Sequence, residues 1–194
     1  MIFYSILDFI NEQSIFDIAG FTIAVLILVK LVSYLLHRYY FSRHARYIRK
    51  ADKILLLIKS MATEDYGRAK IFSYLRKISP YVFEEMVLTA IQNKGYTITR
   101  SKSYSGDGGI DDQCKINGEI YLIQSKRYKG HINRKHVLAF DRLCHSKDVF
   151  GLFVHTGKTG AKSHSKHFYN IDMISGDRLL KLLLDEPLDL SRFK

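Results

Sequence analysis

Residues 111–128, DDQCKINGEIYLIQSKRY, contain two strand-like runs joined by a two-residue turn. Asn117 and Gly118 at its centre favour a type I′ turn, in which both central residues take a positive φ. A regular hairpin around this turn pairs Cys114 with Tyr121 and continues outward in the same register. The sequence therefore predicts an antiparallel hairpin whose pairing is fixed by the turn.

This register brings polar side chains together at the open end of the hairpin. Asp111 pairs with Gln124, and directly paired side chains point to the same face with Cβ atoms about 5 Å apart. Lys126 lies two residues beyond Gln124 and shares that face, because side chains alternate along a strand. Asp112 pairs with Ile123 and points to the opposite face. We therefore expect Asp111, Gln124 and Lys126 to form one group.

A carboxylate, an amide oxygen and an ammonium together suit metal-assisted hydrolysis of a phosphodiester. The oxygens of Asp111 and Gln124 are hard ligands of the kind that Mg²⁺ or Mn²⁺ takes, and a bound ion helps to generate an attacking hydroxide. Lys126 would orient that water and stabilise charge in the transition state. The three glycines of GDGGID (106–111) leave room for a phosphate backbone, since they carry no Cβ. The alternative is a polar hairpin face turned to solvent.

The charge of the 194-residue chain predicts a polyanionic partner, either nucleic acid or an anionic membrane. The formal net charge is +11 and the pI is near 9.6, whereas 47% hydrophobic and 25% charged residues are values of a folded protein. Residues 37–79 hold 11 basic and 3 acidic residues, residues 1–36 have a net charge of −2, and residues 80–194 have +5. Cys114 and Cys144 make no disulfide framework, and we expect two buried thiols.

The segment Ile18–Leu36 has the length and composition of a transmembrane helix, with Lys30 as its one charge. The positive charge follows the segment, which argues against a cleaved signal peptide and places residues 1–17 outside the cytoplasm. We expect a single-pass protein of the bacterial inner membrane, with residues 37–79 as a basic helical linker that meets anionic lipid. A buried helix of a soluble protein is the alternative for the apolar segment.

Residues 80–194 read as one mixed α/β layered domain that begins with a helix. Ser79-Pro80 is a helix start and Gly95 a helix stop, with a buried stripe between them formed by Val82, Phe83, Met86, Val87, Ala90 and Ile91. The remaining elements expected besides the hairpin are strands at 96–99, 149–155 and 172–175, helices at 133–146 and 176–184, and a polar loop with a helix within 156–168.

Several motifs, taken in order, resemble the Mrr-type (type IV) restriction endonuclease family of the PD-(D/E)xK nuclease superfamily. They are FEE (83–85), GY (95–96), GDGGID (106–111), IQSKRY (123–128), GLFVHTGKTGAKSHSKHF (151–168) and MISGDRLLKLL (173–183). The resemblance covers residues 80–186. It implies a restriction-endonuclease-like mixed central sheet flanked by helices, here preceded by the transmembrane helix and the helical linker.

Carried over position by position, the resemblance implies site residues and a substrate. Asp111 matches the metal-binding aspartate, Gln124 takes the place of the second acidic residue, and Lys126 matches the catalytic lysine. Glu84 matches an additional acidic residue that helps to bind metal; its alternative, together with Glu85, is a favourable interaction with the helix dipole. The implied substrate is double-stranded DNA, and the family includes enzymes directed at foreign DNA.

Basic side chains near these motifs are expected to contact DNA phosphates, namely Arg127, Lys158, Lys162 and Lys166. HTGKTG (155–160) lacks the spacing of a nucleotide-binding loop, and GDGGIDD (106–112) lacks the pattern of a calcium-binding loop, so we exclude both.

The sequence thus predicts a membrane-anchored, Mg²⁺-dependent DNA endonuclease. A nuclease-fold module that tethers nucleic acid to the inner membrane without cutting is the first alternative, and an interaction protein whose basic stretch meets only lipid is the second. Cutting of both strands would favour a homodimer. A separate partner would supply specificity, because the sequence contains no evident DNA-reading domain.

Overall fold

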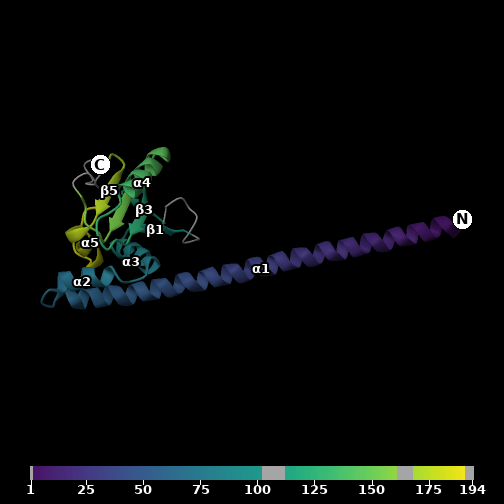
Figure 1. The fold of residues 1–194 in the computed structure, drawn as a ribbon, viewed down its shortest axis with the longest axis horizontal. Helices are drawn as coiled ribbons and strands as arrows, with labels where there is room; N and C mark the ends of the chain where they lie inside the picture. The colour runs from purple at the N-terminus through teal and green to yellow at the C-terminus, as the bar shows by residue number, and fades with distance from the viewer. Residues whose placement is uncertain (1, 102–111, 161–167, 191–194) are drawn as a thin grey trace. The chain divides into compact units, whose positions relative to one another are not determined.

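The computed structural model describes residues 2–101, 112–160 and 168–190, and in this part of the chain a five-stranded mixed sheet carries helices on both faces (Figure 1). The strand order is β1-β2-β3-β4-β5, with antiparallel pairing from β1 to β3 and parallel pairing from β3 to β5. The elements are α1 (Ile2–Ala62), α2 (Gly67–Leu75), α3 (Pro80–Asn93), β1 (Thr97–Arg100), β2 (Asp112–Ile116), β3 (Glu119–Lys126), α4 (Arg134–Ser146), β4 (Phe150–His155), β5 (Ile171–Ile174) and α5 (Gly176–Leu183).

The hairpin of β2 and β3 has the predicted turn and register. Asn117 and Gly118 have φ values of 52° and 93°, as a type I′ turn requires. Cys114 faces Tyr121 across the pair, and at the open end Asp112 faces Ile123. The prediction that Asp111 continues this register concerns a position outside the described residues.

The helix ahead of the sheet also begins and ends as predicted. Pro80 is the first residue of α3, and the carbonyl of Ser79 accepts the hydrogen bond of Phe83 N at 3.0 Å. Gly95 has a φ of 87° and its N–H donates to the carbonyl of Gln92, which ends the helix in the conformation that glycine adopts most easily. All six side chains of the predicted stripe are buried.

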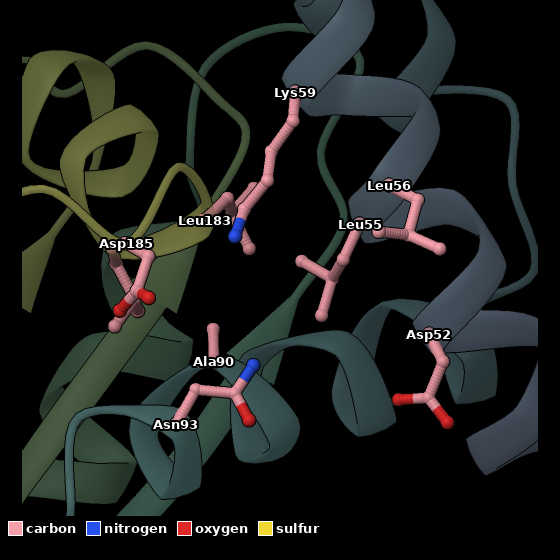
Figure 2. A pocket seen from close by; sticks show the side chains of 9 residues that line it. Asp52, Leu55, Leu56, Lys59, Ala90, Asn93, Leu183 and Asp185 are labelled. Atoms are coloured by element: carbon pink, nitrogen blue, oxygen red, sulfur yellow. The ribbon is translucent and has the colours of Figure 1, made fainter.

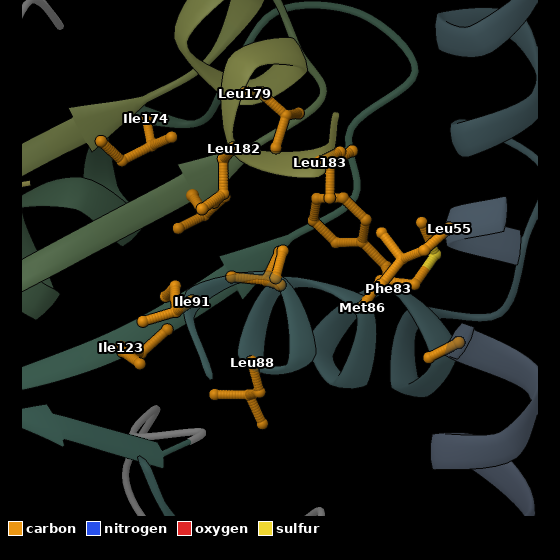
Figure 3. Close-up of a cluster of buried hydrophobic side chains, with 14 of the residues drawn as sticks. Leu55, Phe83, Met86, Leu88, Ile91, Ile123, Ile174, Leu179, Leu182 and Leu183 are labelled. Atoms are coloured by element: carbon orange, nitrogen blue, oxygen red, sulfur yellow. The ribbon is translucent and has the colours of Figure 1, made fainter. Parts of the chain in front are cut away.

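Strand alternation divides the core into two clusters, one on each face of the sheet. On one face α3 and α5 cover residues of β2, β3, β4 and β5, as Figure 3 shows for Ile123, Met86 and Leu182. On the other face α4 covers Leu122 and Phe153. Cys114 lies in the first cluster and Cys144 in the second, so the prediction of two buried thiols is confirmed.

The last turns of α1 belong to the core of the sheet domain. Residues Ala45–Lys194 form one compact unit and Met1–His44 another. Ala51, Ile54 and Ile58 are buried in the α3 face cluster, at the spacing of one helix face. The nuclease domain is predicted to span residues 80–194, and the compact unit that contains these residues also includes residues 45–79.

One segment of the Met1–His44 unit has the length and composition to cross a membrane. It is Ala19–Leu36, eighteen residues with a mean hydropathy of 2.2, and its side chains are exposed along its whole length. A helix of about 20 apolar residues spans the hydrocarbon core of a bilayer. This is the segment in which the sequence predicted a transmembrane helix.

Candidate active site

The predicted residues that the structure brings together lie at the carboxyl end of β3. Gln124 is 5% exposed and Lys126 is partly buried, and both point to the face covered by α4, because they alternate with Ile123 on the α3 face. The parallel neighbour β4 places Phe153 beside Gln124 and His155 beside Lys126. The amide and the ammonium therefore share one face at the end of two adjacent parallel strands.

His155 is a residue of this site that the sequence analysis did not identify. Its side chain is fully buried, its ring lies 5.9 Å from that of Phe153, and Nε2 lies 3.3 Å from Thr159 Oγ1. Burial lowers the pKa of His155 to about 4, although a backbone hydrogen bond to Gly157 acts in the opposite direction. A neutral imidazole thus lies directly beside Lys126.

A pair of hydrogen bonds fixes the chain that follows Lys126. Thr156 Oγ1 donates to the carbonyl of Tyr128 at 2.9 Å and accepts from Tyr128 N at 3.0 Å, which ties the ends of β3 and β4 together. The Tyr128 hydroxyl lies 2.6 Å from His136 Nδ1 on α4, and burial raises the pKa of Tyr128. These contacts hold the backbone around Lys126 in one position.

The basic residues expected to contact DNA have different surroundings. Lys158 is exposed, two residues beyond the Thr156 hydroxyl. Arg127 is partly buried, and its NH1 group donates to the carbonyl of Arg76 at 2.6 Å, so at least part of its guanidinium is engaged within the protein. Lys162 and Lys166 lie outside the described residues. Phosphate contacts by all four remain predictions.

Two buried carboxylates, one on β2 and one on α3, belong to the other face of the sheet. Asp112 accepts a hydrogen bond from Ser101 N, and Glu85 of α3 forms an ion pair with Arg100 at 3.0 Å. Glu84 is partly buried in the first turns of α3, which packs on this same face. Strand alternation therefore does not group Glu84 with the amide and ammonium of β3, and its part in metal binding stays a prediction.

The residues at the end of β3 fit a metal ion in their chemistry, and the carboxylate ligand predicted to join them lies outside the described part of the chain. Gln124 offers a hard amide oxygen of the type that Mg²⁺ accepts. Within residues 2–101, 112–160 and 168–190, no group of three His, Cys, Asp or Glu side chains is arranged to hold a metal. Asp111, the predicted carboxylate ligand, lies one residue before the described start of β2.

A cavity elsewhere in the domain is separate from this site. It has a volume of about 210 Å³ and lies between the end of α1, α3 and α5, with the side chains shown in Figure 2 around it. Leu55 and Leu183 give it an apolar wall, and its charged lining groups are Asp52, Lys59 and Asp185. Since no residue of β3 lines it, the cavity is not part of the candidate active site.

Comparison with known proteins identifies the family. A family model described as restriction endonuclease (Mrr_cat) matches residues 75–183, which is more than half of the chain and includes β3 and β4. No curated protein and no solved structure matches the chain. With its mixed sheet between helices and its Gln124 and Lys126 at the end of β3, the chain belongs to the restriction endonuclease family.

Proposed function

We propose that this protein is a membrane-anchored, Mg²⁺-dependent endonuclease that hydrolyses phosphodiester bonds of double-stranded DNA. The observation that carries the proposal is that Gln124 and Lys126 lie on the same face at the carboxyl end of β3. This strand is within the part of the chain that matches the restriction endonuclease family. The predicted ligand Asp111 would complete the group, in the register already seen for Asp112 and Ile123.

Each residue of the proposed site has a separate task. Asp111 and the Gln124 amide oxygen would hold Mg²⁺, which when bound supplies an activated water and neutralises charge on the phosphate. Lys126, partly buried beside the neutral His155, would orient the attacking water and stabilise the negative charge that builds up on the phosphate oxygens. The tie between Thr156 and Tyr128 would keep the lysine backbone in register with the metal ligands.

We further propose that the segment Ala19–Leu36 anchors the protein in the bacterial inner membrane with the nuclease domain in the cytoplasm. The segment contains one charged residue, and residues 37–79 after it carry a large basic excess, which the positive-inside rule places on the cytoplasmic side. An anchored nuclease would act on DNA that enters at the membrane, and a role in defence against foreign DNA is part of this proposal.

A non-catalytic module that tethers nucleic acid to the membrane is the second candidate. Gln124 favours it, because an amide provides less negative charge for a metal than the acidic residue usual at this position. In that case DNA would bind through the basic side chains, and the affinity would fall with salt but would not depend on Asp111.

Plasmid cleavage by the full chain tests the proposal and separates the two candidates. Truncation at residue 80 would remove buried side chains of α1 and α2, so the full chain in neutral phosphatidylcholine nanodiscs is the sample. We expect wild type to nick or cut supercoiled plasmid with Mg²⁺ but not with EDTA, and Asp111→Ala to bind DNA without cutting it. DNA binding with no cleavage by wild type in Mg²⁺ or Mn²⁺ would instead establish the tethering module.

A further inference from the structure

A second surface feature, a groove beside α2, is not explained by the proposed active site. The groove has a volume of about 380 Å³ and lies between α2, the chain that follows β4, and the start of α5. The residues that line it include two arginines and two glycines, and they are Arg68, Ala69, Phe72, Arg76, Thr156, Gly157 and Gly176. Most of α2 precedes residue 75, where the match to the restriction endonuclease family begins.

The two arginines of the groove are held differently, Arg76 by contacts with neutral groups and Arg68 by an exposed ion pair. The Arg76 guanidinium lies over the Phe72 ring, 5.7 Å from its centroid, and its Nε donates to the carbonyl of Thr156 at 3.3 Å. Arg68 forms an ion pair with Asp177 in which both side chains are more than half exposed. An exposed ion pair contributes at most about 1 kcal/mol, so a phosphate can replace this carboxylate as the partner of Arg68.

The groove is joined directly to the proposed active site by hydrogen bonds. Arg127, the residue after Lys126, donates to the carbonyl of Arg76 at the end of α2. Thr156 lines the groove and also bonds the backbone of Tyr128. Both walls of the groove are thus attached to the chain within two residues of Lys126.

Gly157, which lines the groove, is followed by a third basic residue, Lys158. A Cβ at this position would lie 2.7 Å from the carbonyl oxygen of Gly130 and 2.7 Å from Tyr128 Cβ, so only glycine allows the chain to pack this closely. The next residue, Lys158, has an exposed side chain, and its backbone pairs with that of His131 in an isolated parallel β-bridge. The positive charges of Arg68, Arg76 and Lys158 therefore occur on one short, tightly packed part of the surface.

We propose that this α2 groove binds the phosphodiester backbone of double-stranded DNA away from the bond that is cut. This inference rests on the proposed function for the identity of the polyanion. The groove suits phosphate oxygens for two reasons. A guanidinium donates paired hydrogen bonds to such oxygens, and the glycines leave space for the DNA backbone. Residues 63–79, which the sequence analysis assigned to the basic helical linker, would then position the substrate.

The salt dependence of DNA binding tests this inference. The sample is the full chain in neutral phosphatidylcholine nanodiscs with Lys126→Ala, so that the DNA is not consumed, and the probe is a fluorescent duplex of unrelated sequence. Arg68→Gln with Arg76→Gln removes two phosphate contacts, which should lower the slope of log K against log salt by about 1.8. The loss of affinity between 50 and 200 mM salt would then be about 12-fold smaller than in the parent.

Matched variants keep the result interpretable. Arg142→Gln with Lys147→Gln removes the same charge from exposed positions on α4 and the turn after it, and should leave the slope unchanged. Arg68→Lys alone keeps the charge and should retain most of the affinity. Protection of Cys114 and Cys144 from a thiol reagent verifies that each variant is folded, since both thiols are buried.

An unchanged slope in the folded double variant, or an equal fall in the α4 control, would overturn the groove proposal. Cleavage by the protein with native Lys126 distinguishes this failure from failure of the proposed function. If that protein cuts plasmid and the slope does not move, only the groove proposal is wrong. If it does not cut and the slope falls by the expected amount, the groove stands as a DNA-binding site on a protein without nuclease activity.

Discussion

The buried His155 should make the stability of the sheet domain depend on pH in a defined window. Its folded pKa of about 4 is below the value of 6.5 for an exposed imidazole. Between these two values the unfolded chain binds a proton that the folded chain excludes, so stability is lost as the pH falls from about 6.5 toward 4. One pKa unit corresponds to about 1.4 kcal/mol, so the free energy of unfolding changes by about 3 kcal/mol over the whole window. Between pH 7 and pH 4.5 it falls by about 2 kcal/mol.

The perturbation that isolates this effect is His155→Gln, which removes the titrating group and keeps a polar side chain of similar length. The free energy of unfolding in urea is measured from the tyrosine signal in near-ultraviolet circular dichroism, to which the buried Tyr121 contributes. EDTA is present throughout so that metal binding does not contribute. We expect wild type to lose about 2 kcal/mol more than His155→Gln between pH 7 and pH 4.5.

His145→Gln is the matched control, because His145 is an exposed histidine on the helix that covers the same face. This variant should follow the wild-type pH dependence. Parallel curves for wild type and His155→Gln across the window would refute the reasoning, since they would mean that the His155 imidazole is protonated as easily in the folded chain as in the unfolded one.

Two further variants test packing and charge in the same domain. Gly151→Ala should lower the free energy of unfolding by about 1–3 kcal/mol, because the new Cβ would lie 2.6 Å from Cys144 Sγ and 2.8 Å from Phe140 Cε1. Adding Cys144→Ala should restore part of the lost stability. A urea midpoint of the single variant equal to that of wild type would contradict this. Arg178→Met should lower the free energy of unfolding in urea by about 3 kcal/mol, because it leaves the buried Asp172 carboxylate without its two guanidinium hydrogen bonds. Adding Asp172→Asn should recover stability. A double variant that is less stable than Arg178→Met alone would contradict this account.

Much of the sheet was predictable because local chemistry determines it. The Asn117-Gly118 turn fixes the pairing of β2 with β3, and the observed register follows from it residue by residue. Gly95 and Pro80 mark the ends of α3 for similar local reasons. The match to the restriction endonuclease family over residues 75–183 agrees with the resemblance seen in the motifs.

The parts that escaped prediction depend on contacts between distant segments. The chain between β3 and β4 contains a helix, so no tight turn fixes the register of these two strands. The position of His155 beside Lys126 could therefore not be derived from residue spacing. The amphipathic end of α1 gave no sign of which surface it would cover, and the sequence analysis therefore assigned it to a linker.

The rate of plasmid cleavage by Lys126→Ala shows whether the carboxyl end of β3 is the active site. The comparison is with wild type and with Lys115→Ala, which removes an exposed lysine from the same hairpin near its turn. We predict that Lys126→Ala cuts at least about 100-fold more slowly, because it removes a charge that stabilises the transition state, and that Lys115→Ala cuts at the wild-type rate. Equal cleavage rates for wild type and Lys126→Ala in Mg²⁺ would contradict the assignment of the carboxyl end of β3 as the active site.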